Sequence, residues 1–346
     1  MSSVYNIMTD DWYNSAVDLK AKGMSNRGIA RTLFGNENYR NRLNDFFKND
    51  TVIEDVYNRE RELQEDENIK AHILSSQLIN DYSDWQKKEK PSVTQVDKDK
   101  PTILVIADTQ AKSEEDLEYL LWIGHYIAEK QPDVIVHIGD HYDFPSLSSY
   151  DKGKASSEGR RLYKDIEAGN TGFEYLNLAM KSIPDYNPRK VFCLGNHEHR
   201  LSRYVDDNPE LIGTLGVDKL PFEKYGWEVH PFLKPVEIEG IYFVHYLANP
   251  FTGKPYSGSA ANILSKVGKS FVVGHKQMLD ISIRPTIDGS LQLGIVNGAC
   301  YDFSESYKGY QGNNHFRGLT VLHECAEGFG VPMFVSLDYM KEKYYE

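Results

Sequence analysis

The sequence predicts an α/β domain preceded by a small all-α domain, and three observations support this prediction. The first 50 residues place apolar side chains at helical spacing, interrupted by glycines. From residue 99 onward, short apolar runs alternate with longer helical patterns. Several of the apolar runs end on an aspartate, asparagine or histidine, which is typical of parallel strands that bring functional side chains to one edge of a sheet.

Composition restricts the class of protein. The chain has 346 residues, 40% of them hydrophobic, which is enough to fill one large core and a smaller one. No apolar stretch reaches the roughly 18 residues that span a bilayer, and the first residues lack the pattern of a secretion signal, so we expect a cytoplasmic protein without a membrane partner. The cysteines have no paired spacing and are expected as reduced core residues: Cys193, Cys300 and Cys325.

The first domain is predicted over residues 1–50. Its segment from residue 16 to 47 breaks at Gly23 and Gly35 and carries Ser25 as a helix N-cap. Three short helices separated by tight turns resemble a helix-turn-helix module, with residues 25–35 as the first helix and turn and residues 36–47 as the recognition helix. The alternative is a small helical bundle used for packing or dimerisation.

Local charge favours DNA binding by this module. The net charge of the whole chain is −12, which makes the protein as a whole a poor binder of polyanions. Between Lys20 and Lys48, however, seven basic residues stand against two acidic ones. The predicted DNA contacts are Arg27, Arg31, Arg40 and Arg42.

Residues 51–98 are expected to connect the two domains. They begin with a charged, mostly helical stretch up to residue 87 and continue with a run rich in lysine, aspartate and proline, which is the composition of a linker. The second domain is therefore predicted over residues 99–346.

The second domain opens with a predicted βαβ unit. Residues 102–108 (TILVIAD) and 133–140 (DVIVHIGD) read as buried strands, and residues 113–130 between them read as an amphipathic helix that opens on a Ser113 cap. Since a helical crossover joins parallel strands, Asp108 and Asp140 are expected at the same edge of the sheet.

Five segments place metal-capable side chains directly after an apolar strand. They read ADTQ (107–110), GDHYD (139–143), GNHEHR (195–200), VHY (244–246) and GHKQ (274–277). In this order and spacing they resemble the calcineurin-like metallophosphoesterases, and the resemblance runs from about residue 101 to the end of the chain. It implies a sandwich of two mixed β-sheets flanked by helices. The alternative is a degenerate fold in which these residues only pack or hold a structural ion.

The resemblance implies a phosphoester hydrolase with two divalent metal ions. Two ions neutralise the phosphoryl oxygens and bridge the hydroxide that attacks phosphorus. His197 matches the general acid that protonates the leaving oxygen, and Asp143 matches the carboxylate that orients this histidine. Asp140 matches the ligand that bridges both ions. The implied metal ligands are Asp108, Gln110, Asp140, Asn196, His245, His275 and Gln277.

Two of these ligands depart from the common family pattern. Many members carry histidine where this chain has Gln110 and Gln277, and both positions belong to the same metal site. A glutamine oxygen suits a hard cation, so we expect Mn²⁺, with Mg²⁺, Fe²⁺ and Zn²⁺ as the other candidates. The segments DTQ, GHKQ and GNNHFRGLTVLHE further resemble metallophosphoesterases encoded by tailed bacteriophages, in which this glutamine pair is a regular feature. A phage-encoded protein would act in the host cytoplasm.

The same resemblance supplies candidate substrate contacts. These are His199, Arg200, His315 and His141, with Arg160, Arg161 and Arg317 as further candidates.

Three functions remain open at this point. The first is a phosphodiesterase or nuclease acting on DNA, which gives both predicted domains a role, one in DNA binding and the other in catalysis. A phosphomonoesterase acting on protein, nucleotides or nucleic-acid ends is the second, because the Gly-Asn-His-Glu run and Asp143 resemble phosphatases equally well. The third is a DNA-binding regulatory or scaffold protein with a weakly active phosphoesterase domain. Fold class alone does not separate them, and the sequence leaves the oligomeric state open, a homo-oligomer included.

Overall fold

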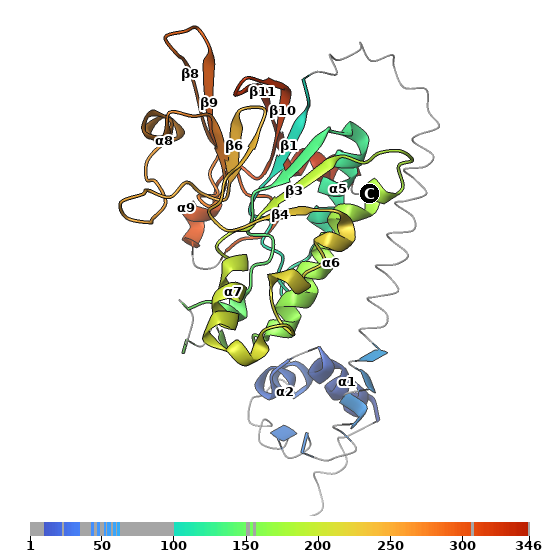
Figure 1. The fold of residues 1–346 in the computed structure, drawn as a ribbon. Helices are drawn as coiled ribbons and strands as arrows, with labels where there is room; N and C mark the ends of the chain where they lie inside the picture. Colours follow the sequence, from blue (N-terminus) through green and yellow to red (C-terminus); the bar gives the residue numbers. More distant parts are fainter. Residues whose placement is uncertain are drawn as a thin grey trace, which may run out of the picture. The chain divides into compact units, whose positions relative to one another are not determined.

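Figure 1 shows the fold in a computed structural model of the chain. The structure describes residues 10–22, 24–34, 100–149, 153–154, 157–305 and 308–344, together with single residues and short runs between 43 and 62. The chain divides into two compact units, Met1–Trp85 and Gln86–Glu346. None of the helices in the described ranges combines the length and the apolar character that a membrane crossing requires.

In the described part of the N-terminal unit, the helices with defined bounds are α1 (Asp10–Ala21) and α2 (Asn26–Phe34). α2 is amphipathic, and α1 buries Ala16 and Val17. The resulting small core consists of the buried residues Ala16, Ile29, Ala30 and Leu43. A helix, α2, is therefore present where the sequence predicts a helix over residues 25–35, and the helix-turn-helix itself stays a prediction.

The start of α2 agrees with the sequence signal. The Ser25 hydroxyl accepts a hydrogen bond from the backbone N–H of Gly28 at 3.2 Å, which satisfies one of the free amides of the first helical turn. The predicted recognition helix over residues 36–47 falls almost wholly outside the described residues, as do Arg40, Arg42 and the predicted linker up to residue 99.

The larger unit contains two mixed β-sheets. In the first sheet the strand order is β11-β10-β1-β2-β3-β4. β1 to β4 run parallel to one another, whereas β10 pairs antiparallel with both β1 and β11. The strands are β1 (Ile103–Ile106), β2 (Val134–His137), β3 (Arg189–Cys193), β4 (Glu228–His230), β10 (Gly318–Ala326) and β11 (Phe329–Ser336).

The second sheet has the strand order β5-β6-β7-β9-β8. Its three inner strands, β6, β7 and β9, are parallel, and the two edge strands are antiparallel to their neighbours. The strands are β5 (Val236–Ile238), β6 (Ile241–Val244), β7 (Phe271–Val273), β8 (Asp280–Pro285) and β9 (Leu291–Val296).

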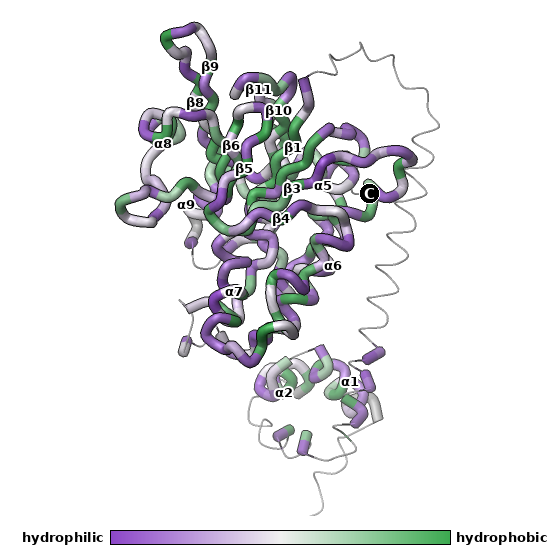
Figure 2. Tube along the Cα trace, viewed as in Figure 1, coloured by the Kyte–Doolittle hydropathy of each residue, from purple (hydrophilic) through white to green (hydrophobic). Residues whose placement is uncertain are grey.

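The two sheets pack face to face and helices cover them. The core between the sheets joins Val105 and Val136 of the first sheet to Phe243 and Ile295 of the second. Figure 2 shows this apolar character along the central strands, with hydrophilic residues around α7. The predicted sandwich is confirmed. The helices are α5 (Glu118–Lys130), α6 (Leu162–Lys181), α7 (Glu198–Asp207), α8 (Ala260–Val267), α9 (Gly309–Asn313) and α10 (Leu337–Tyr344).

The predicted βαβ unit is present as β1, α5 and β2, but its helix differs from the prediction. It begins at Glu118 and not after Ser113, because the chain following β1 first runs beside the β2 loop, where the N–H of Ala111 donates to the carbonyl of His141 at 2.7 Å. The helix is also not amphipathic. Residues 119–128 are all buried, and α5 packs against both α6 and α10.

Candidate metal centre

The residues predicted as metal ligands lie in five loops, each following a parallel strand. Since parallel strands deliver their carboxyl ends to the same edge, these loops meet at one end of the sandwich. Asp108 and Gln110 follow β1, Asp140 follows β2, Asn196 follows β3, His245 follows β6, and His275 and Gln277 follow β7.

Five of these residues hold a left-handed backbone conformation. The φ angles are 49° at Asp108, 45° at Gln110, 55° at Asp140, 66° at His275 and 56° at Gln277. A non-glycine residue in this region costs on the order of 1 kcal/mol or more, and such residues gather at functional sites. The rest of the fold therefore holds these side chains in place against a local conformational cost.

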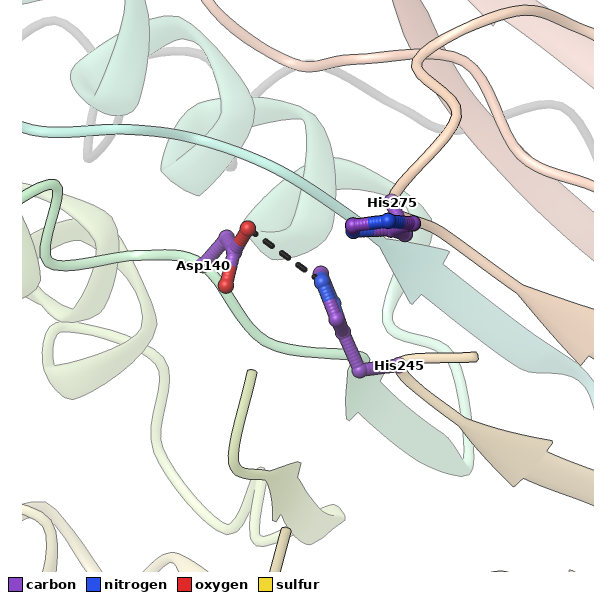
Figure 3. Close-up of side chains that lie close together, drawn as sticks. All are labelled: Asp140, His245 and His275. Carbon is purple, nitrogen blue, oxygen red and sulfur yellow. Dashed lines mark ion pairs between the residues drawn. The ribbon is translucent and has the colours of Figure 1, made fainter. Parts of the chain in front are cut away.

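The first group of ligands converges on His245. The side chains of Asp140, His245 and His275 offer ligand atoms that all lie within 4.8 Å of one another. Figure 3 shows these three side chains, with the ion pair between Asp140 and His245. The Nε2 atom of His245 lies 3.2 Å from Oδ2 of Asp140 and 2.9 Å from Oδ1 of Asn196. A carboxylate, an amide oxygen and two imidazoles are a donor set that binds divalent transition metals.

The tautomer of His245 suits a metal ligand. Its Nδ1 atom lies 2.9 Å from the carbonyl oxygen of Ile138, to which an Nδ1–H donates, so Nε2 faces the ligand group. Burial alone lowers the pKa of His245, but Asp140 and Asp108 beside it raise that pKa to about 9.

The second group consists of Asp108, Gln110 and Gln277. Burial raises the pKa of Asp108 to about 6. Its Oδ2 atom accepts a hydrogen bond from the backbone N–H of His275 at 3.0 Å, and its Oδ1 atom accepts one from Nε2 of Gln277 at 3.4 Å. The Oε1 atom of Gln110 is buried and has no hydrogen-bond partner. An unsatisfied buried oxygen beside a carboxylate fits a site for a hard cation.

Close backbone approaches explain the glycines of these loops. A Cβ atom at Gly195 would lie 2.1 Å from Oδ1 of Asp140, and one at Gly274 would lie 2.6 Å from Oδ2 of Asp108. Each glycine thus leaves room for a carboxylate that comes from a different loop.

His197 lies beside the first ligand group. Its Nδ1 atom forms an ion-pair contact of 2.7 Å with Oδ1 of Asp143, and its Nε2 atom lies 3.6 Å from Oδ2 of Asp140. Burial lowers the pKa of His197, but Asp140 and Asp143 outweigh it, so that the pKa is raised overall. The Nη2 atom of Arg200 lies 2.9 Å from the same Nε2, and Nη1 donates to the carbonyl of Asp143 at 2.8 Å. The predicted proton donor, its carboxylate and a cationic substrate contact are therefore neighbours.

Glu198 is a part of the centre that the sequence did not reveal. Its fully buried carboxylate accepts four backbone hydrogen bonds: from the N–H groups of His141 (2.7 Å) and Tyr142 (2.9 Å) at Oε1, and of Asp140 (2.9 Å) and Gly195 (2.8 Å) at Oε2. It thereby ties the loop after β2 to the loop after β3. Its position in the Gly-Asn-His-Glu run was visible, but its burial was not.

His141 does not occupy the position expected of a substrate contact. The side chain is fully buried, its Nδ1 lies 2.8 Å from the Thr109 hydroxyl, and its Nε2 lies 2.9 Å from the carbonyl oxygen of Gly169. Both ring nitrogens are thus engaged inside the protein. We correct the prediction and treat His141 as a structural residue.

The other substrate candidates are more accessible. His199 is half-buried, and its ring stacks on Phe232 with the ring centroids 4.8 Å apart. His315 is also half-buried. Its Nδ1 lies 3.1 Å from the carbonyl oxygen of Gly312, and its Nε2 has no hydrogen-bond partner. Both histidines therefore stay candidates for substrate binding.

Comparison with known proteins identifies a family. The family described as calcineurin-like phosphoesterase matches residues 101–305. The gene 54 protein of Mycobacterium phage D29 is 30% identical over 179 residues, which are 50% of this chain and 68% of that protein. The gene 54 protein of Mycobacterium phage L5 is 28% identical over 178 residues, with the same two shares.

Solved structures that this chain resembles include an archaeal phosphodiesterase and a nuclease of Pseudomonas putida. The first is 13% identical with a TM-score of 0.32, and the match covers 68% of this chain and 99% of that chain. The second is 12% identical with a TM-score of 0.29, and the match covers 67% of this chain and 87% of that chain.

Proposed function

The chain belongs to the calcineurin-like phosphoesterase family, whose members are metal-dependent hydrolases of phosphoester bonds, and on this premise we propose that it is a phosphodiesterase that cleaves DNA. The observation that carries the proposal is the convergence of Asp140, Asn196 and His245 beside His197. The basic N-terminal segment is the reason to propose DNA as the substrate.

Two groups of residues would hold the metal ions. Asp140, Asn196, His245 and His275 form one site, and Asp108, Gln110 and Gln277 form the other together with Asp140. When bound, the ions activate a water molecule and neutralise charge on the phosphoryl oxygens. We propose Mn²⁺ for both positions, because the second group offers only oxygen donors, which suit a hard cation better than Zn²⁺.

His197 is the proposed general acid. Asp143 holds the Nδ1 side of its ring and raises its pKa, so the imidazole keeps a proton that Nε2 can pass to the leaving oxygen of the ester. The Nη2 group of Arg200 can only donate and points at the same nitrogen at 2.9 Å, so Arg200 must turn to a phosphoryl oxygen before Nε2 carries that proton. After cleavage, His197 regains its proton from solvent.

The N-terminal unit is the proposed DNA-binding part. Arg27 and Arg31 lie one helical turn apart on α2, and both are exposed. Positive side chains on one helix face attract the phosphate backbone and would bring DNA to an otherwise acidic protein.

Hydrolysis of phosphomonoesters is the second candidate function. The 2.7 Å contact between His197 and Asp143 supports it, because a histidine that stays protonated can serve the leaving group of a monoester equally well.

A panel of substrates separates the two functions. Full-length protein with Mn²⁺ should hydrolyse bis-p-nitrophenyl phosphate and cut linear DNA, and His197→Ala and Asp140→Ala should each lose both activities by a factor of about 100 or more. Hydrolysis of p-nitrophenyl phosphate without any diester cleavage would refute the nuclease and favour the monoesterase. Metal-loaded protein that is silent on every ester would refute both.

A further inference from the structure

Lys308 lies beside the second group of ligands. Its ammonium donates hydrogen bonds to the hydroxyl of Tyr301, at 2.8 Å, and to Oε1 of Gln277. The Tyr301 hydroxyl donates to the same Oε1 at 3.0 Å. Lys308 and Tyr301 therefore hold the amide oxygen of a residue that we propose as a metal ligand.

This contact turns the Gln277 amide away from the metal position. With Oε1 facing Lys308 and Tyr301, the amide presents Nε2 to Asp108, at 3.4 Å from Oδ1. An N–H group cannot coordinate a cation, so the amide must rotate before its oxygen becomes a ligand. Gln110 differs, because its buried Oε1 has no hydrogen-bond partner and needs no such release.

Charge adds to the effect of orientation. The Lys308 ammonium donates to Oε1 of Gln277, whose Nε2 donates to Oδ1 of Asp108, so the positive charge lies next to the second group of ligands. A positive charge a few ångströms from a divalent ion opposes binding of that ion, and the effect is strong in a site screened from water.

We propose that Lys308 is an internal competitor of the second metal ion. While its ammonium holds Gln277, the group of Asp108, Gln110 and Gln277 binds a divalent cation weakly, and a tight second ion requires Lys308 to withdraw. The inference rests on the proposed metal centre. The proposal implies two forms of the protein. One form binds a single ion tightly, at Asp140, Asn196, His245 and His275, and the other binds two ions tightly.

Calorimetric titration of metal-free full-length protein with Mn²⁺ tests the proposal. We expect the wild type to bind one ion tightly and a second one weakly. Lys308→Gln removes the ammonium and should tighten the second site about tenfold or more, and leave the first site within about twofold. Tyr301→Phe removes one of the two donors to Gln277 and should give a smaller tightening. The electron spin resonance signal of coupled manganese pairs should appear at lower Mn²⁺ in Lys308→Gln.

Lys266→Gln is the matched control, because it removes the same charge from an exposed position on α8. It should leave both sites unchanged, and equal tightening in Lys266→Gln and Lys308→Gln would refute a local role of Lys308. An unchanged second site in Lys308→Gln, with native circular dichroism, would overturn the inference and leave the proposed function intact. Absence of the tight first site from the wild type would instead refute the proposed metal centre itself.

Discussion

Among single residues, Glu198 has the largest structural role in the centre. Its carboxylate accepts hydrogen bonds from four backbone N–H groups in two loops, one carrying Asp140 and the other Asn196. Each of these buried N–H groups is paired with Glu198, so a lost bond leaves a buried donor unsatisfied. Glu198 thus helps to set the distance between the two ligand loops, together with the hydrogen bond from the N–H of His197 to Oδ1 of Asp140.

Glu198→Gln tests that role. The amide keeps one acceptor oxygen but turns an NH₂ group toward two backbone N–H donors, so we expect a loss of about 3 kcal/mol in the free energy of unfolding. Urea denaturation of metal-free protein measures this loss. Glu210→Gln, at an exposed position, should change stability by less than about 0.5 kcal/mol. A Glu198→Gln protein as stable as the wild type would show that the four bonds contribute little.

Some residues of the candidate site could be predicted from the sequence and others could not, for physical reasons. The residues at strand ends were predictable. An apolar run predicts a buried strand, and the polar residue that follows it, such as Asp108, Asp140 or His245, marks where the strand ends. Lys308 and Tyr301 were not predictable, because neither lies in a strand-end motif. Their contact with Gln277 depends on how the chain after β9 folds back onto the loop after β7. The burial of His141 was hidden for the same reason, since Gly169 on α6 provides its partner.

At the scale of elements, a buried ion pair joins the segment after β1 to the segment after β9. The Nζ atom of Lys112 lies 3.0 Å from each carboxylate oxygen of Glu305, and the two side chains are only 10% and 7% exposed. These segments also carry Gln110 and Lys308. The ion pair therefore holds the segment that carries Gln110 to the segment that carries Lys308.

Removing one partner of this pair should destabilise the protein strongly. Lys112→Met leaves a buried carboxylate without its counter-charge, and we expect a loss of about 3–5 kcal/mol. The double variant Lys112→Met, Glu305→Met should recover a large part of that loss, because no charge remains buried. Thermal unfolding of the two single variants and the double variant forms the required cycle. Additive losses would show that the two charges do not depend on each other.

The loops after β2 and β3 approach each other too closely for a larger residue than glycine. In Gly195→Ala the new Cβ would meet Oδ1 of Asp140 at 2.1 Å, so either the loop or the carboxylate must move. We expect Mn²⁺ affinity at the first site to fall about tenfold or more, while the far-ultraviolet circular dichroism stays native. Calorimetric titration measures the affinity. Unchanged binding in a folded variant would show that Asp140 has room to shift.

At the scale of the molecule, the two units are proposed to divide binding from catalysis. A chain shortened to residues 99–346 should then hydrolyse bis-p-nitrophenyl phosphate at the rate of the full chain but bind DNA more weakly. In the full chain, Arg27→Ala with Arg31→Ala should weaken DNA binding and reduce its salt dependence by about two counterions. Fluorescence anisotropy with labelled duplex measures both effects. DNA affinity that survives both changes would exclude the N-terminal unit as the binding site.

The architecture of the larger unit was largely predictable and the N-terminal unit was less so. Alternation of strands and helices indicates a layered α/β fold. The order of the five motifs resembles a family whose fold is a sandwich of two sheets, and this resemblance predicted the second sheet. The start of α5 was predicted wrongly from the Ser113 cap signal. The N–H of Ala111 instead bonds to the carbonyl of His141 in the loop after β2, and the helix begins only at Glu118. For residues 36–47 the only support is the sequence pattern, so the recognition helix stays a prediction.

The position of β1 in its sheet has a consequence for the synthesis of the protein. β1 carries Asp108 and lies between β2 and β10, so that Leu104 pairs with Ile135 on one side and with Val321 on the other. A ribosome releases the chain from the N-terminus, and the partner strand β10 is among the last segments to emerge. The hydrogen-bonded frame around Asp108 is thus completed only when translation is nearly finished. The described contacts of the N-terminal helices lie within the first 62 residues, so we expect these helices to fold long before the proposed metal centre is complete.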